Sequence, residues 1–501
     1  MPLLLSMPRL AHRLGTLLRP LGLGLLLALL LPLTSGWTSS AEPALTFEER
    51  LDALLNPRAI GPAIWGVYVR DLDNGRVLYR RNAAVPLLPA STQKILTTAG
   101  ILDLLGSTHR FETTLHLDGR VDGTVLRGDV YLRGSGDPSF GSAQLDGSDP
   151  LEEWAERLAE IGITRVEGRL IGDDDVFDDR PWAEGWDIDY LTRQAGGGMG
   201  VSTSGLAYRD NVVRVRVQST RPGEPARIVA DPPGFFELEN DVTTSGRSRG
   251  GGVRFERRFG EEGYRLYGSV PRSYRRTLRL PVTNPTQLAV HSLAHHLREA
   301  GITVDATLWD VDDLPEPPNY ARTEALLVHY APPLASLAAI TNKESNNVYA
   351  EHLFRILSRD GSVTGSERRL LALLERAGAP TAGLLIRDGS GLSRKDLISA
   401  EALGELLAFF HAQHPERSAF VESLAAGGEP STTLESRLEE VPVRAKTGSL
   451  RSVRTLSGYV EAANGHTLAF AILANNYGAP SYRINQVVDQ MVVEMTQVGV
   501  E

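Results

Sequence analysis

The sequence predicts a mixed α/β (α+β) fold, in which an antiparallel sheet flanked by helices is interrupted by a large β-rich insertion. Strand-like runs occur near the beginning of the chain, at 63–70 and 76–80, and again near its end, at 441–476. Helical periodicity dominates 318–414, whereas 114–317 consists mainly of short β-like runs between Gly, Asp and Pro turns. A sheet with strands from both ends of the chain implies one domain split by an insertion.

The first part of the split domain is predicted to contain a hairpin and a helix. Asn74-Gly75 separates two strand-like runs, which is a strong signal for a β-hairpin. Residues 91–106 carry apolar side chains at helical spacing, and Ser91 lies at or near the start of that helix. Pro89, just before it, suits the entry to a helix better than its interior.

The insertion is expected to contain helices near 150–162 and 286–300 and a flexible loop at 196–200. Helices return with the run LLVHYAPPLASLAAITN, at 326–342, and a last helix from about Tyr482 to Val498 closes the chain. The predicted division is a signal peptide at 1–41, a first part of the split domain at 42–113, the insertion at 114–317 and the second part at 318–501.

Composition excludes several classes of protein. With 501 residues, 42% of them hydrophobic, the chain can bury a large core. Its formal net charge of −10 argues against non-specific binding of nucleic acid. The absence of cysteine excludes disulfides, thiolate metal sites, a catalytic thiol and a lipidated amino-terminal cysteine.

The amino terminus resembles an export signal. Three arginines precede an apolar run at 21–33, which has signal-peptide length and is shorter than the roughly 20 residues that span a bilayer. Ser39 and Ala41 fit a cleavage site before Glu42, and Thr34 and Gly36 offer a rival site. An uncleaved anchor is the alternative. No later stretch is apolar enough to span a membrane, so a periplasmic or otherwise extracytoplasmic location is expected.

Three short motifs occur once each and in this order: Ser91-Thr-Gln-Lys94, Ser345-Asn-Asn347 and Lys446-Thr-Gly448. Only four of the 52 basic residues are lysines, and two of the four lie in these motifs. Arginine keeps its proton near neutral pH, whereas lysine can lose it when its surroundings lower its pKa. The lysines in the motifs are therefore candidates for proton transfer.

Each motif has a chemical and a purely structural interpretation. A serine and a lysine three residues apart share one helix face, so neutral Lys94 could take the proton of Ser91; an ordinary helix is the alternative. Hydroxyls at Thr447 and Ser449, the charge of Lys446 and the open space at Gly448 suit a peptide with a carboxylate end; an exposed edge strand is the alternative. The Ser-Asn-Asn motif could be a helix cap. Their joint occurrence favours chemistry.

These motifs resemble those of the penicillin-binding protein 4 type of D-alanyl-D-alanine carboxypeptidase and endopeptidase, the low-molecular-mass class C penicillin-binding proteins. The segments NKESNNVYAEHLFRIL, RGSGDPSF, DGSGLSR and AKTGSLRSVRTLSGYV are also similar to family segments. The spacing of 254 positions from Ser91 to Ser345 is typical of the family, because this segment houses extra domains inserted into a serine β-lactamase/transpeptidase-like domain.

The resemblance implies a role for each site residue. Ser91 is the nucleophile, Lys94 its general base, Ser345 a proton relay to the leaving amine, and Asn347 a ligand of the substrate amide. Lys446, Thr447, Gly448 and Ser449 bind the substrate, and the backbone N–H groups of Ser91 and Ser449 form the oxyanion hole.

The predicted function is hydrolysis of peptidoglycan stem peptides ending in D-alanyl-D-alanine, through an acyl-enzyme that β-lactam antibiotics also form. A β-lactamase or esterase on the same scaffold and a non-catalytic wall-binding protein are the alternatives. Five aspartates at 173–179 lack the glycine and glutamate of an EF-hand loop and are predicted to be a solvated turn. No metal, cofactor or nucleic-acid partner is expected, and the oligomeric state stays open.

Overall fold

The computed structural model describes residues 45–499 apart from 57–59, 146, 188, 191–201 and 259. The predicted signal peptide at 1–41 and the loop at 196–200 lie outside the described residues. No helix in the described part of the chain is long and apolar enough to cross a membrane.

A six-stranded antiparallel sheet combines strands from both ends of the chain, as predicted, in the order β16-β17-β18-β19-β1-β2. The strands are β1 Ile64–Asp71, β2 Val77–Arg81, β16 Ala425–Ala426, β17 Val443–Leu450, β18 Val453–Glu461 and β19 Thr467–Asn475. The predicted hairpin at Asn74-Gly75 is confirmed, since Gly75 adopts φ +76° and β1 pairs with β2.

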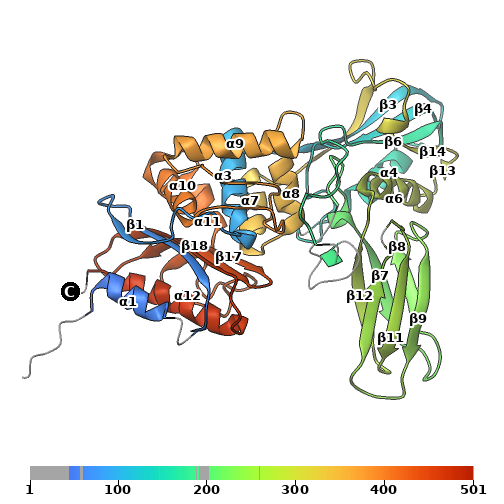
Figure 1. The fold of residues 1–501 in the computed structure, drawn as a ribbon. Helices are drawn as coiled ribbons and strands as arrows, with labels where there is room; N and C mark the ends of the chain where they lie inside the picture. Colours follow the sequence, from blue (N-terminus) through green and yellow to red (C-terminus); the bar gives the residue numbers. More distant parts are fainter. Residues whose placement is uncertain are drawn as a thin grey trace, which may run out of the picture. The chain divides into compact units, whose positions relative to one another are not determined.

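Helices cover both faces of this sheet (Figure 1). One face carries α1 Phe47–Leu54 and α12 Ser481–Thr496, which share a core with inward side chains of the sheet. The other face carries α3 Gln93–Leu105, α7 Leu334–Lys343, α8 Asn347–Ile356, α9 Val363–Arg376, α10 Ala400–Gln413 and α11 Arg417–Ser423. Because both faces of the sheet are covered, β19 has an unbroken apolar run at 468–474, LAFAILA.

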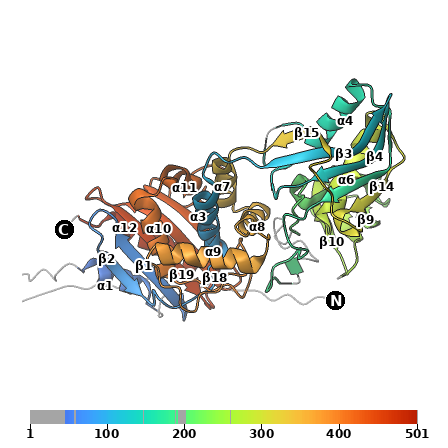
Figure 2. The same ribbon diagram turned by 90° about the horizontal axis from the view of Figure 1, so that it is seen from above.

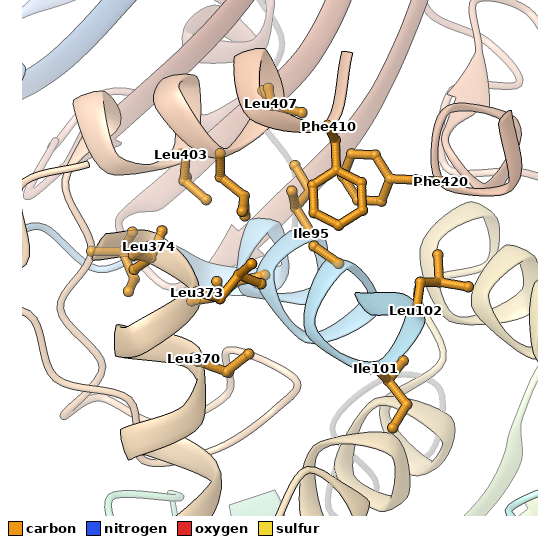
Figure 3. Packing of buried hydrophobic residues seen from close by; sticks show 14 of the residues in the cluster. Ile95, Ile101, Leu102, Leu370, Leu373, Leu374, Leu403, Leu407, Phe410 and Phe420 are labelled. Atoms are coloured by element: carbon orange, nitrogen blue, oxygen red, sulfur yellow. The ribbon is translucent and has the colours of Figure 1, made fainter. Parts of the chain in front are cut away.

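Helix α3 lies in the middle of the second layer, which fixes the segment that follows Ser91. Figure 3 shows Ile95, Ile101 and Leu102 of α3 surrounded by leucines of α9 and α10 and by Phe410 and Phe420. Its residues from Gln93 to Leu102 are all buried. A helix that is apolar on nearly all sides belongs in a core, and it therefore holds its amino terminus in one place.

The insertion leaves the split domain after α3 and returns before α7 on two paired strands. These are β3 Glu112–Asp122 and β15 Glu324–Tyr330, which pair antiparallel and lie side by side in Figure 2. The prediction of a helix beginning at 326 is wrong for 326–330: pairing with β3 outweighs the apolar periodicity there. Pro332 and Pro333 then end the strand, and α7 begins at Leu334.

In the described part of the chain, the strands of the insertion, β3 and β15 included, form three sheets. The largest contains β3, β4 Val125–Arg133, β5 Arg165–Glu167, β6 Arg169–Asp173, β13 Thr303–Val304, β14 Thr307–Asp310 and β15. Two three-stranded sheets follow, β12-β7-β8 and β10-β11-β9, with bounds β7 Val212–Gln218, β8 Arg227–Asp231, β9 Leu238–Thr244, β10 Gly252–Glu256, β11 Tyr264–Val270 and β12 Arg275–Pro281. The two predicted helices are present as α4 Pro150–Glu160 and α6 Pro285–Glu299.

We propose the predicted division of the chain with one change: the insertion extends to Tyr330, because β15 pairs with β3. Residues of the insertion also form hydrogen bonds with side chains of helix α8 in the split domain. The Arg355 guanidinium donates to Asp178 and to the Arg180 carbonyl, and the Tyr349 hydroxyl donates to Ser142 at 3.0 Å. These contacts reach the helix that begins at Asn347.

The aspartate-rich run at 173–179 is only partly the solvated turn that the sequence predicts: Asp175 and Asp179 are exposed, but Asp173 and Asp174 are not. Asp173 ends β6 and is buried, and it accepts a hydrogen bond from the Tyr320 hydroxyl. Asp174 accepts from the hydroxyls of Ser204 and Thr286. Burial raises the pKa of Asp174. The prediction is wrong for these two residues, whose partners come from segments distant in the sequence.

Helix α8 makes stability depend on pH. Burial lowers the pKa of His352 from 6.5 to about 4. Between these two pH values His352 is therefore protonated in the unfolded chain and neutral in the folded chain. The free energy of unfolding should therefore fall by about 3 kcal/mol from this residue as the pH drops from about 6.5 to about 4. Urea unfolding across this range, for the parent and His352→Gln, should show a shallower pH slope in the variant; equal slopes would contradict the assignment.

Candidate active site

Ser91 lies at the entry to the buried helix, as predicted. It is the middle residue of the short 3₁₀ turn η1 Ala90–Thr92, which leads directly into α3. The turn is fixed by Ala90 in a left-handed conformation (φ +47°) and by the Thr92 hydroxyl, which donates to the Pro89 carbonyl at 2.6 Å. Ser91 is half-buried, whereas its neighbours are fully buried, so the serine side chain reaches the surface from a rigid base.

The Lys94 ammonium group joins parts of two sequence motifs. Its Nζ donates to Ser91 Oγ at 3.1 Å and to Asn347 Oδ1 at 2.7 Å. A third hydrogen bond, 2.7 Å long, goes to the Ser390 carbonyl. The side chain is completely buried, and burial lowers its pKa to about 8, against the opposing influence of Asp388 and Glu351. Lys94 can therefore lose its proton near neutral pH and accept another from Ser91.

The Ser-Asn-Asn motif connects α7 and α8. Asn346 caps α8, accepting from the Tyr349 backbone N–H at 3.2 Å, so the cap interpretation holds for this residue. Asn347, the first helical residue, presents its amide to Lys94. Ser345 is half-buried and has a left-handed backbone (φ +61°), a conformation that non-glycine residues adopt mainly where their surroundings enforce it.

The Lys-Thr-Gly motif lies on β17, next to the turn that carries Ser91. A methyl group added at Gly448 would come within 2.0 Å of Thr455 Oγ1 and 3.0 Å of the Ser91 backbone nitrogen. The Thr455 hydroxyl donates to the Pro89 carbonyl at 2.8 Å and so ties β18 to the same turn. The glycine therefore permits the strand to lie directly against the backbone N–H of the serine.

The remaining residues of this motif differ in exposure. Lys446 is fully buried, and its Nζ donates to the Thr447 carbonyl at 2.8 Å. Thr447 is 9% exposed, and Ser449 is exposed. Burial, together with the charge of Lys94, lowers the pKa of Lys446. Repulsion between the two amines favours the state in which only one of them carries a proton.

The sequence did not reveal the buried carboxylates that fix the loop in contact with Lys94, namely Glu351 and Asp388. The Glu351 carboxylate, buried on α8, accepts from the backbone N–H groups of Gly389 and Ser390 at 3.3 and 2.8 Å. Asp388 accepts from the N–H groups of Gly391 and Ser393 at 2.6 and 2.7 Å, and from the Trp186 indole at 2.8 Å. These bonds fix the loop whose Ser390 carbonyl holds Lys94. The signal that could have identified this support is a glutamate in the middle of a helical run, with the apolar side chains of Val348 and Phe354 at helical spacing from it.

One group of described side chains has spacing that could hold a metal ion: Asp71, Asp73 and His466. Asp71 already accepts from His466 Nδ1 at 2.8 Å and from the Asp73 backbone N–H at 3.0 Å, as part of the β1–β2 turn. The group is thus satisfied as a turn, and the prediction of no metal and no cofactor stays a prediction.

The antiparallel sheet, the buried helix and the grouping of Ser91, Lys94 and Asn347 are those of the serine β-lactamase/transpeptidase-like hydrolases. Residues 47–498 match the model of the D-Ala-D-Ala carboxypeptidase 3 (S13) family, and the chain belongs to that family. It is a serine-type D-alanyl-D-alanine carboxypeptidase of the penicillin-binding protein 4 type, which confirms the predicted family, fold class and enzyme class.

Individual proteins support the same assignment. The chain is 31% identical to a D-alanyl-D-alanine carboxypeptidase of Actinomadura sp., over 86% of this chain and 81% of that protein. It is 25% identical to a D-alanyl-D-alanine carboxypeptidase of Haemophilus influenzae, over 82% and 85% respectively. The crystal structure of penicillin binding protein 4 from Haemophilus influenzae has the same fold, with a TM-score of 0.74 and 22% identity over 89% of this chain and 99% of that one.

Proposed function

We propose that Ser91 is the nucleophile with which this carboxypeptidase cleaves the terminal peptide bond of peptidoglycan stem peptides. The observation that carries the proposal is the pair of hydrogen bonds from Lys94 Nζ, to Ser91 Oγ at 3.1 Å and to Asn347 Oδ1 at 2.7 Å. The same amine is buried and has a pKa of about 8. A general base must be within hydrogen-bond reach of the proton it takes and have a pKa near the working pH, and Lys94 satisfies both conditions.

The proposed acylation step uses Lys94, Ser345 and two backbone N–H groups. Neutral Lys94 removes the hydroxyl proton of Ser91 while Ser91 Oγ attacks the carbonyl carbon of the peptide bond between the two D-alanines. The backbone N–H groups of Ser91 and Ser449 donate to the oxyanion, a role supported by the close contact of Gly448 with the Ser91 nitrogen. Collapse of the tetrahedral intermediate breaks the C–N bond, and the leaving amine takes up a proton through Ser345. Water then hydrolyses the ester and restores Ser91.

The substrate carboxylate is proposed to lie against Thr447, Ser449 and Lys446, where a strand offers hydroxyls beside a buried amine. A cavity of about 710 Å³ continues from Ser449 along residues that include Arg451 and Arg454. Arginines suit the remaining carboxylates of a stem peptide, because the guanidinium group can donate two parallel hydrogen bonds. Asn347 is proposed to hold the substrate amide.

β-Lactams should acylate Ser91, since penicillin binding protein 4 of Haemophilus influenzae has been crystallised with a β-lactam. Brief exposure to benzylpenicillin should raise the intact mass of the parent protein by one penicillin, while Ser91→Ala should stay unmodified. A modified Ser91→Ala variant would refute the assignment of the nucleophile. Rapid hydrolysis of the drug without an adduct would favour the β-lactamase alternative, and neither adduct nor hydrolysis would favour the non-catalytic one.

The pH dependence of acylation tests the role of Lys94. Because the neutral amine is the active form and its pKa is about 8, the second-order rate constant for acylation should rise with pH to a plateau above about 8. Stopped-flow measurement with a chromogenic β-lactam between pH 6 and 10 gives this profile directly. A rate that is flat across this range, or that falls, would exclude Lys94 as the base.

We place the enzyme outside the cytoplasm. Its polymeric substrate lies beyond the cytoplasmic membrane, and the amino-terminal sequence resembles an export signal. Comparing the mass of the protein purified from an exporting host with that of the full chain identifies cleavage after Ala41, cleavage at the rival site or retention of the segment.

A further inference from the structure

The part of the insertion from β7 to β12 differs in charge from the rest of the chain. Residues 212–281 contain 14 arginines, no lysine and eight acidic residues, a formal charge of +6, whereas the whole chain carries −10. The two three-stranded sheets of this region contribute their apolar faces to one hydrophobic core, which includes Val213, Val215 and Val217 of β7 and Leu266 of β11. Their outer faces are therefore available to solvent.

The positive charge is concentrated on the outer face of the sheet β12-β7-β8. Directly opposed residues of antiparallel strands point to the same side, and the register places Arg214 opposite Arg279 and Gln218 between Arg275 and Arg227. Arg216 lies between Arg214 and Gln218 along β7 and points to the same side. We name this surface the arginine face, and its five arginines are Arg214, Arg216, Arg227, Arg275 and Arg279. All are exposed except Arg214, which is half-buried.

Internal ion pairs leave most of this charge uncompensated. Like charges directly opposite on a sheet, such as Arg214 and Arg279, are destabilising. Arg279 is paired with Asp210 at 2.6 Å, whereas the other four members have no ion pair to any residue that the structure describes. Asp231 lies directly opposite Arg214 on this face, but its ion pair is with Arg209, at 2.9 Å. The folded protein therefore retains electrostatic repulsion between these arginines, and a bound anionic ligand would reduce that repulsion.

The second sheet provides an internal comparison. On the outer face of β10-β11-β9, Arg265 is within 4 Å of three acids, Glu239, Asp241 and Glu256. Arg254 on this face lies in register with Tyr267. Two arginines are thus balanced by three acids on a neighbouring face of similar size. A general preference of the chain for arginine does not explain the arginine face.

We propose that the arginine face binds peptidoglycan strands through the carboxylates of their stem peptides. Arginine forks suit carboxylates, and a flat surface with strands about 4.8 Å apart offers several forks side by side to a repeating anion. The polymer on which the carboxypeptidase acts carries such carboxylates, so this inference rests on the proposed function. The negative charge of the rest of the chain would repel that polymer, which makes a separate basic surface useful for retaining it.

The test separates binding from catalysis by using Ser91→Ala protein throughout. Its co-sedimentation with purified sacculi should weaken about tenfold when Arg216, Arg227 and Arg275 are all changed to glutamine, and should weaken with added salt. Arg254→Gln/Arg265→Gln, on the other sheet, is the matched control and should sediment like its parent. In a Ser91-containing background, the triple variant should cleave a small soluble D-alanyl-D-alanine peptide at the parental rate.

Equal sedimentation of the triple variant and its parent would overturn the proposal. So would undiminished binding to sacculi whose carboxylates have been amidated, which would point to phosphate groups instead. If the triple variant lost binding to phosphatidylglycerol vesicles but not to sacculi, the ligand of the arginine face would be a membrane surface and not peptidoglycan. Failure of the Ser91-containing parent to cleave the small peptide would refute the proposed function alone, because sedimentation of Ser91→Ala does not depend on turnover.

Discussion

Lys94→Arg should lower the rate constant for acylation by about 10³-fold while leaving the positive charge in place. The buried Lys94 amine lies 3.1 Å from Ser91 Oγ and has a pKa of about 8. An arginine at this position would stay protonated over the whole pH range in which the protein is folded. The measurement is the rate of acylation by a chromogenic β-lactam, together with kcat/KM for a D-alanyl-D-alanine peptide.

The chain offers matched controls for this change. Lys343 is paired with Glu429 at 2.6 Å, and Lys395 is paired with Glu184. Both lie where a fixed charge suffices, so Lys343→Arg and Lys395→Arg should retain parental activity. Lys94→Met, uncharged and of similar length, separates the loss of a base from crowding by the larger guanidinium group. Parental acylation by a folded Lys94→Arg or Lys94→Met would show that another group takes the proton.

The parts of the site that depend on local geometry could be predicted from the sequence. Ser91 and Lys94 are three positions apart in the sequence, and a helix brings side chains at that spacing within hydrogen-bond distance. Gly448 was predicted to leave space for a peptide; its close contact with the Ser91 backbone arises from packing between β17 and the serine turn. The sequence predicts that the surroundings of these lysines lower their pKa values; the structure identifies burial as the main cause at Lys94, and burial together with the charge of Lys94 as the cause at Lys446.

The supporting groups could not be predicted because their partners lie far away in the sequence. The Ser390 carbonyl binds Lys94 across 296 residues, and Asp388 meets Trp186 of the insertion across 202. No periodicity carries such information. The same reason explains the error at β15: LLVHY has a helix-compatible apolar pattern, and its strand conformation comes from pairing with β3, more than 200 residues earlier in the chain.

Gly448→Ala should reduce acylation by about 10²-fold and lower the melting temperature. The added methyl group would meet Thr455 Oγ1 at 2.0 Å and the Pro89 carbonyl at 2.9 Å, both on groups held by their mutual hydrogen bond. Relief of this overlap requires β17 to move away from the turn that carries Ser91. The two N–H groups proposed to form the oxyanion hole then separate, and misplacing one such donor typically costs 10²–10³ in rate. Acylation rates per folded molecule, with thermal unfolding in parallel, measure both effects.

Gly458→Ala separates strain in the sheet from damage to the site. A methyl group there would come within 2.1 Å of the Arg444 carbonyl, an overlap as severe as that at Gly448, on the strand next to β17. Both variants should unfold at a lower temperature, but only Gly448→Ala should lose acylation rate among the molecules that remain folded. Equal losses in the two variants would attribute the effect to the sheet as a whole. A larger loss in Gly448→Ala would support the contact between β17 and the serine turn as the element that assembles the oxyanion hole.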